Sequence, residues 1–266
     1  MALIEVRGLK KAFGDVVVLD GVDLDIERGE FVTLMGVSGS GKSLLVKMLI
    51  GLLPADAGTI RFDGEDVTHL PEHEWTPVRR RIGMLFQEYA LFDSMSVFDN
   101  VAYGLREQRL MPEPQIAERV KESLDSVSLP DSADLWPKEL SGGMKKRVAL
   151  ARAIAMHPEV VFYDEPTEGL DPINVTRVDR LMLRLRAEKG ITSVIVTHNM
   201  QSAFKISDRL IFLHDGQVAL TGTPDELRAR REDPRLRHFV EASLKRLPRR
   251  SRPPGTPSEP PPVGVP

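Results

Sequence analysis

Short runs of β-branched and other apolar residues alternate along the chain with longer segments in which apolar residues recur every three or four positions. Runs of this length are typical of strands, and a repeat of three to four residues is typical of helices with one buried face. The runs predict strands over residues 4–9, 31–35, 82–86, 160–163, 193–197 and 210–213. Strands that alternate with helices indicate an α/β domain around a largely parallel sheet.

The helices and turns are predicted from periodicity and from proline and glycine. The expected helices run from Lys42 to near Gly51 and over residues 114–127, 141–156 and 172–189. Proline or glycine follows two of them, at Pro158 and Gly190. Asp-Gly pairs at Asp63 and Asp215 stand between strand-like runs, and this dipeptide favours the tight turn of a β-hairpin. Some antiparallel structure should therefore accompany the parallel sheet.

The middle of the chain, residues 88–156, is mostly helical in this interpretation and separates two strand-rich halves. We interpret it as a helical subdomain inserted into the sheet domain, so that residues 1–246 form one folded unit. Residues 247–266 are rich in proline and glycine and carry too few apolar groups to offset the entropy of ordering. We expect this tail to be disordered.

Charge and composition exclude several classes of protein. The chain has 36 basic and 39 acidic residues, a net charge of -3, which gives no overall attraction to nucleic acid. It has no cysteine, so disulfides, thiolate metal sites and cysteine nucleophiles are excluded. No segment reaches the roughly 18 uncharged apolar residues of a membrane helix. We therefore expect a soluble protein that reaches a membrane only through partners.

A glycine-rich loop joins the predicted strand 31–35 to the helix that opens at Lys42. Its residues are Gly36, Val37, Ser38, Gly39, Ser40, Gly41, Lys42 and Ser43. This is the P-loop pattern in its required context, in which main-chain N–H groups and the helix N-terminus surround phosphate oxygens. Lys42 would contact the β and γ phosphates of a nucleotide, and the Ser43 hydroxyl would bind Mg²⁺.

Two carboxylates, Asp164 and Glu165, follow the predicted strand 160–163. Ligands of open α/β sheets bind beyond the carboxyl ends of the strands, so both acids should emerge beside the phosphate loop. We expect Asp164 to hold Mg²⁺ through water and Glu165 to polarise the attacking water.

The sequence LSGGM at residues 140–144, followed by the helix KKRVALARAIA, closely resembles the signature motif of ABC ATPases. Other residues of the chain resemble further elements of that family, in the family's order. Gln87 resembles the Q-loop glutamine, the Gly-Leu-Asp sequence at Gly169 the D-loop, and His198 the switch histidine. Phe13 stands where an aromatic residue usually stacks on adenine. Taken singly, Gln87 and His198 would be polar strand ends and Phe13 a core residue.

The resemblance implies a P-loop NTPase core of the ABC ATPase type, with an antiparallel β subdomain and an inserted helical subdomain. It implies a head-to-tail homodimer in which each ATP lies between one phosphate loop and the partner's signature loop. The implied cofactors are ATP and Mg²⁺, with Ser43, Gln87 and Asp164 at the metal and Glu165, His198 and Gln87 as catalytic residues. The implied ATP-binding residues are Phe13, Gly36, Val37, Ser38, Gly39, Ser40, Gly41, Lys42, Ser43, Gln87, Ser141, Gly142, Gly143 and His198.

A narrower resemblance is to the ATPases of Mla-type phospholipid transporters, which work with MCE-domain lipid-binding subunits. It is carried by LFQEYALFDSMSVFDNVAYGLRE, by Met144 in the signature, by YDEPTEGLDPI and by DPRLRHFV. The resemblance implies a peripheral protein on the cytoplasmic face of the inner membrane. The membrane permease would dock near Phe92–Phe98, with Phe92, Met95, Val97 and Phe98 as an apolar groove or, alternatively, as ordinary core.

The chain departs from the family pattern at Glu168, where a small residue or threonine is usual, at Asn199, where an acid is common, and at Phe13, where tyrosine is commoner. None of these departures removes a phosphate or metal ligand, but Glu168 puts the details of the dimer interface in doubt.

Three alternative functions stay open. A P-loop small-molecule kinase would need an acceptor pocket and has no use for LSGGM. A non-transport ABC protein acting on DNA or ribosomes usually has tandem ATPase domains, coiled coils or basic patches, which this sequence lacks. An ATPase of an importer for amino acids or another small solute would carry the same motor motifs.

Overall fold

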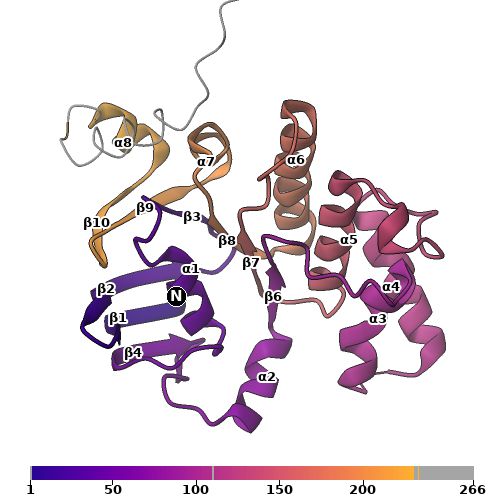
Figure 1. The fold of residues 1–266 in the computed structure, drawn as a ribbon, viewed down its shortest axis with the longest axis horizontal. Helices are drawn as coiled ribbons and strands as arrows, with labels where there is room; N and C mark the ends of the chain where they lie inside the picture. Colours follow the sequence, from indigo (N-terminus) through magenta and orange to yellow (C-terminus); the bar gives the residue numbers. More distant parts are fainter. Residues whose placement is uncertain (1, 110, 231–232, 234–266) are drawn as a thin grey trace, which may run out of the picture.

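The computed structural model describes residues 2–109, 111–230 and 233. Within them, an antiparallel sheet has the strand order β2-β1-β4-β5. Its strands are β1 (Ala2–Phe13), β2 (Val16–Glu27), β4 (Ala57–Phe62) and β5 (Glu65–Asp66). This sheet occupies the lower left of Figure 1.

A second sheet has the order β10-β9-β3-β8-β7-β6 and is parallel except for β10. Its strands are β3 (Phe31–Gly36), β6 (Ile82–Leu85), β7 (Val160–Asp164), β8 (Thr192–Val196), β9 (Arg209–His214) and β10 (Gln217–Gly222). Every residue of β3 and β8 is buried, as expected for central parallel strands covered on both faces.

The helices fall into two groups, which Figure 1 separates. Those around the sheets are α1 (Lys42–Leu49), α2 (Trp75–Arg80), α6 (Pro172–Lys189), α7 (Met200–Ile206) and α8 (Pro224–Ala229). The helices α3 (Val97–Glu107), α4 (Glu113–Ser126) and α5 (Gly142–Ile154) lie together at the right, between β6 and β7 in the sequence. Two 3₁₀ turns, Glu72–Glu74 and Pro137–Glu139, complete the described elements.

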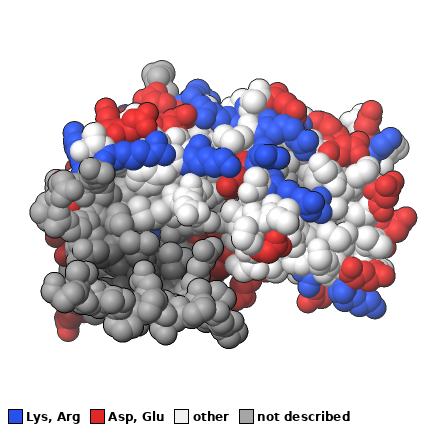
Figure 2. All heavy atoms as spheres, turned by 90° about the horizontal axis from the view of Figure 1, so that it is seen from above, with Lys and Arg blue, Asp and Glu red and all other residues white. Residues whose placement is uncertain are grey.

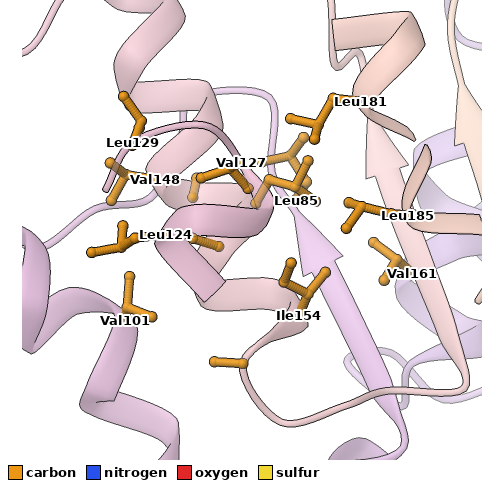
Figure 3. Close-up of a cluster of buried hydrophobic side chains, with 14 of the residues drawn as sticks. Leu85, Val101, Leu124, Val127, Leu129, Val148, Ile154, Val161, Leu181 and Leu185 are labelled. Carbon is orange, nitrogen blue, oxygen red and sulfur yellow. The ribbon is translucent and has the colours of Figure 1, made fainter. Parts of the chain in front are cut away.

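Two large hydrophobic clusters hold these parts together. One lies between the two sheets and includes Leu24, Phe62 and Leu45. The other joins α3, α4 and α5 to β7 and α6, and Figure 3 shows Leu124 and Val148 of the helical group in one cluster with Val161 and Leu185. Because the second cluster is continuous, the helical group is packed on the edge of the parallel sheet by apolar contact.

Parallel pairing brings four strand ends to one edge of the sheet. In the register of the pairs, Leu34 lies beside Val196, Val196 beside Asp164, and Tyr163 beside Leu85. The segments that follow β3, β8, β7 and β6 therefore emerge next to one another.

The predicted strands and helices are all present, with bounds that differ by a few residues. Both Asp-Gly turns are confirmed: Asp63 and Asp215 have φ of 55° and 47°, and each closes a hairpin. No ranges were predicted for β2, β4, β5, β10, α2, α3, α7 and α8, although strand-like runs were expected on both sides of each Asp-Gly turn. The helices α2, α7 and α8 are only six or seven residues long, so tertiary packing decides their conformation. By contrast, α3 has apolar residues at helical spacing, at Val97, Val101 and Leu105, and lies within the predicted helical subdomain, although its bounds were not predicted. The predicted disordered tail, residues 247–266, lies outside the described residues.

Candidate functional site

The phosphate loop, residues 36–43, leads from the end of β3 into α1. Two of its glycines leave no room for a larger side chain. A Cβ on Gly36 would lie 2.4 Å from the carbonyl oxygen of Leu213, and a Cβ on Gly41 would lie 2.6 Å from the Leu19 side chain. Gly41 also has φ of 92° and gives α1 no side-chain cap. The first N–H groups of α1 are therefore available to an anion.

The ammonium group of Lys42 lies over this loop. It donates to the carbonyl oxygens of Gly36 and Val37 at 2.9 Å each and to the Ser40 hydroxyl at 3.3 Å. A full positive charge thus stands beside the N–H groups of the loop. This donor set suits the phosphates of a nucleotide.

The next residue, Ser43, lies against the end of β7. Its Oγ donates to Oδ1 of Asp164 at 3.4 Å. Burial raises the pKa of Asp164, and the negative charge of Glu165 raises it further. A bound cation would offset both effects, and a hydroxyl with a carboxylate is the hard-oxygen donor set that Mg²⁺ prefers. Among the described residues no cluster of three or more His, Cys, Asp or Glu could hold a metal, so phosphate and water oxygens would complete this site.

Glu165 is held by the loop that follows β8. One carboxylate oxygen, Oε1, lies 2.9 Å from Nδ1 of His198, and the other accepts from the Thr197 hydroxyl at 3.0 Å. The Glu165 main chain has φ of 47°, a left-handed conformation that is strained for a residue other than glycine. Its N–H donates to the carbonyl oxygen of Val196 at 2.9 Å. The structure thus brings Glu165 and His198 together, and both can exchange protons.

Gln87, beyond the end of β6, has a partner that the sequence did not indicate. Its amide nitrogen donates to Oε2 of Glu168 at 2.6 Å. Within the described part of the chain it makes no hydrogen bond to Ser43 or Asp164. Glu168 is therefore more than a departure from the family pattern, since it fixes the direction of the Gln87 side chain.

Lys146 is a second residue of the candidate site that was not predicted from the sequence. It is only 2% exposed, and its ammonium donates to the main-chain oxygens of Gln87 and Glu165. Burial lowers its pKa, and the charges of Glu168, Glu165 and Asp164 oppose that effect. Nothing in the repeat of the helix distinguishes this lysine from a solvent-facing one, so the sequence carries no usable signal.

The signature residues Ser141, Gly142 and Gly143 begin α5. The Ser141 hydroxyl caps the helix by accepting from the N–H of Met144 at 3.3 Å. Ser141 and Gly142 are exposed, and a Cβ on Gly142 would make an ordinary contact of 3.4 Å with the Tyr89 hydroxyl, so the loop is open to a partner molecule. No hydrogen bond joins it to residues 36–43 within the described chain. One molecule thus carries two separate helix N-termini suited to anions.

Phe13 ends β1 and is 53% exposed, beside the exposed Val16 and Val17. The alternative interpretation of Phe13 as a core residue is therefore wrong. The ammonium of Lys11 lies 5.6 Å from its ring centroid. An exposed aromatic face of this kind can stack on a base.

The apolar segment between Phe92 and Phe98 is partly core. Val97 is fully buried, so its prediction as a groove residue is wrong, whereas Phe98 is half-buried and packs against the helical cluster. Phe92 is 39% exposed and its ring lies 4.7 Å from that of Tyr103, which is 37% exposed. The buried Asn100 shapes the segment by donating to the carbonyl oxygens of Phe92, Met95 and Ser96.

Known proteins resemble this chain along most of its length. A model of the ABC transporter family matches residues 19–168. The intermembrane phospholipid transport system ATP-binding protein MlaF of Haemophilus influenzae is 41% identical over 239 residues, 90% of this chain and 90% of that protein. The sulfate/thiosulfate import ATP-binding protein CysA of Methylococcus capsulatus is 44% identical over 227 residues, 84% of this chain and 64% of that protein.

Among solved structures, the dimer of the ATP-binding cassette MJ0796 bound to ADP and Pi has a TM-score of 0.77 and 32% identity, and covers 83% of this chain and 98% of its own. The expected fold is thereby confirmed, and the kinase alternative is wrong. The chain belongs to the ABC transporter family, as an ATP-hydrolysing subunit similar to the ATPases of Mla-type phospholipid transporters.

Proposed function

We propose that this ATPase works as a homodimer that powers phospholipid transport through membrane permease subunits and an MCE-type lipid-binding subunit. The observation that supports phospholipid as the cargo is the 41% identity of this chain with MlaF over 90% of both chains. The CysA relative has a similar identity, but this chain spans only 64% of its length. None of the described helices is long and apolar enough to cross a membrane, so the proposal assigns the membrane path to partners.

In the proposed site, each side chain at the carboxyl ends of β3, β6, β7 and β8 has a role. The triphosphate lies on the loop amides and Lys42, while Ser43, Asp164 and Gln87 surround the metal. Mg²⁺, when bound, would neutralise phosphate charge and polarise the γ-phosphoryl group. Glu165 polarises the attacking water and accepts its proton. Although both of its oxygens already have partners, a carboxylate has about four lone-pair sites, so one stays open to water.

His198 has two functions in this scheme. Its Nδ1 orients the Glu165 carboxylate, and its other ring nitrogen is directed at the γ-phosphate. Phe13 stacks on adenine. The signature residues Ser141, Gly142 and Gly143 close the site of the second subunit, which agrees with their separation from the phosphate loop of their own chain.

For the permease we propose the exposed ring pair Phe92 and Tyr103 as the docking surface, on the helical subdomain 88–156. Paired exposed aromatic rings are typical of the buried centre of protein interfaces. Nucleic acid is not a proposed partner, because basic and acidic side chains are interspersed on the face in Figure 2 and the net charge is -3.

An importer of a small solute is the second candidate, favoured by the 44% identity with CysA. The two functions are separated by purifying the tagged full chain from detergent-solubilised membranes of its native host and identifying bound proteins and lipids by mass spectrometry. A permease together with an MCE protein and phospholipid supports the first proposal. A permease with a periplasmic solute-binding protein, and no enrichment of MCE protein, would replace it with the second.

A further inference from the structure

Lys146 is a buried cation that joins two parts of the proposed ATP site. It projects from α5, and its Nζ lies 2.9 Å from the carbonyl oxygen of Gln87 and 3.0 Å from that of Glu165. The Tyr89 ring lies on another side, with its centroid 5.1 Å from Nζ. Among the described residues no carboxylate oxygen approaches within 4 Å. A lysine without an ion pair is seldom buried to this extent, because burial of the charge is unfavourable.

Both segments that Lys146 contacts have strained main chains. Glu165 has φ of 47°, and Tyr89 and Ala90, just after Gln87, have φ of 64° and 49°. Left-handed backbone at a residue other than glycine is unfavourable and persists only where surrounding contacts enforce it. A donor to the carbonyl oxygen of Glu165 is such a contact.

Arg152, farther along α5, supports the same loop at other points. Its guanidinium donates to the carbonyl oxygens of Ala90 at 2.6 Å and Tyr89 at 3.0 Å. Arg152 holds only the loop after Gln87, whereas Lys146 holds that loop and Glu165 together. The Gln87–Glu168 hydrogen bond also links the two segments, but it joins side chains, whereas Lys146 holds the main chains of Gln87 and Glu165 at a fixed distance.

We propose that Lys146 is a positioning residue for ATP hydrolysis, which holds the main chains of Gln87 and Glu165 in the register that the reaction requires. The inference rests on the proposed roles of Gln87 and Glu165 in the ATP site. Lys146 touches neither of the reacting side chains and acts through their backbones. Its effect should appear in the rate of the chemical step, because small displacements of reacting groups reduce rates far more than they reduce binding.

The test compares four variants of the full-length chain, purified with the membrane proteins that bind it. Lys146→Met keeps the length of the side chain but removes the charge and the donors. Lys146→Gln keeps two N–H donors on a shorter, uncharged side chain, and Lys146→Arg keeps the charge with donors for both carbonyl oxygens. Lys121→Met is the matched control, since Lys121 is an exposed lysine of α4 without a hydrogen bond in the described structure.

Turnover, nucleotide affinity and thermal stability are measured for each. We expect Lys146→Met to lower kcat roughly 10- to 100-fold while the Kd for ATP changes less than about threefold. The rate should recover in the order Met, Gln, Arg, and Lys121→Met should match the wild type. If Lys146→Met does not fold, the Gln and Arg variants decide the question.

A folded Lys146→Met or Lys146→Gln protein with kcat within twofold of the wild type would overturn the inference. So would an equal loss of ATP affinity and rate in all three Lys146 variants, which would mean a purely structural lysine. Glu165→Gln is assayed in parallel to tell failure of this inference from failure of the proposed site. If Glu165→Gln hydrolyses ATP at the wild-type rate, the proposed site itself is wrong. If Glu165→Gln is slow but the Lys146 variants hydrolyse ATP at the wild-type rate, the proposed site stands and Lys146 has no part in it.

Discussion

Nδ1 of His198 lies 2.9 Å from Oε1 of Glu165, across the ends of two adjacent parallel strands. The contact forms because β7 and β8 are neighbours, so the residues that follow them emerge side by side. The Thr197 hydroxyl holds the second carboxylate oxygen. Glu165 is thus fixed in direction before any substrate arrives, which is what a residue that orients water requires.

The first prediction concerns Glu165→Gln. Glutamine keeps the size and the hydrogen-bonding oxygen but cannot accept a proton, so we expect nucleotide binding to persist and kcat to fall by about 10²- to 10⁴-fold. Phosphate release and binding of a fluorescent ATP analogue measure the two effects. Wild-type turnover in this variant would remove Glu165 from the mechanism.

Replacement of Lys42 by alanine should act on binding. The ammonium is a charged donor beside the loop amides, and such a contact is worth about 1.5–3 kcal/mol. The Kd for ATP should therefore rise roughly 10- to 100-fold. Calorimetric titration checks this, with Lys121→Met as the control. Unchanged affinity would contradict the assignment of the phosphate site.

Phe13→Ala should weaken the binding of nucleotide through the base. Base–aromatic stacking contributes about 1–3 kcal/mol, so the Kd for ATP should increase by about fivefold or more, while inorganic triphosphate binds as before. Phe92→Ala removes another exposed ring and should leave ATP affinity unchanged. The same loss in both variants would show that Phe13 has no specific contact with adenine.

Sites shared between subunits predict complementation. Ser141→Arg blocks the signature loop and Lys42→Ala disables the phosphate loop, so each homodimer should be inactive. In an equal mixture, half of the dimers carry one intact site, and we expect about a quarter of the wild-type rate. The double variant Ser141→Arg/Lys42→Ala, mixed with either single variant, serves as the control, since no intact composite site can form. Equal rates in the mixture and the controls would argue against independent shared sites.

An ion-pair network around Glu159, just before β7, predicts that the stability of the protein falls at acid pH. Glu159 accepts from Arg81 and Arg28, and these contacts, led by Arg81, hold its pKa below the ordinary 4.5. A lowered folded-state pKa stabilises the protein above pH 4.5, and this contribution is lost as the pH falls through the lowered value.

Glu159→Gln should therefore lower Tm by a few degrees at pH 7, equivalent to about 1 kcal/mol after allowance for solvent screening. The difference from wild type should shrink as the pH falls through the folded pKa. Melting curves from pH 3 to pH 7 test this, with Glu118→Gln as the control because Glu118 is exposed and has no hydrogen bond in the described structure. A deficit that does not depend on pH would mean that packing, and not ionisation, accounts for the effect.

The sequence alone determined the local features whose physics lies within a few residues. The phosphate loop needs glycines and a following helix, and a buried strand that ends in Asp164 and Glu165 is visible as an apolar run before two acids. The Asp-Gly turns also depend on two residues only. These elements were therefore predicted correctly, and the motif order was enough to indicate the ABC family.

The contacts between distant segments were decided only by the tertiary structure. Strand order places His198 beside Glu165, and the packing of α5 on the sheet carries Lys146 into the site and leaves Val97 in the core. Gln87 meets Glu168 across 81 residues of chain. No local sequence pattern encodes such pairs. The position of a residue in a helix determines which face its side chain is on, but not which other segment packs against that face.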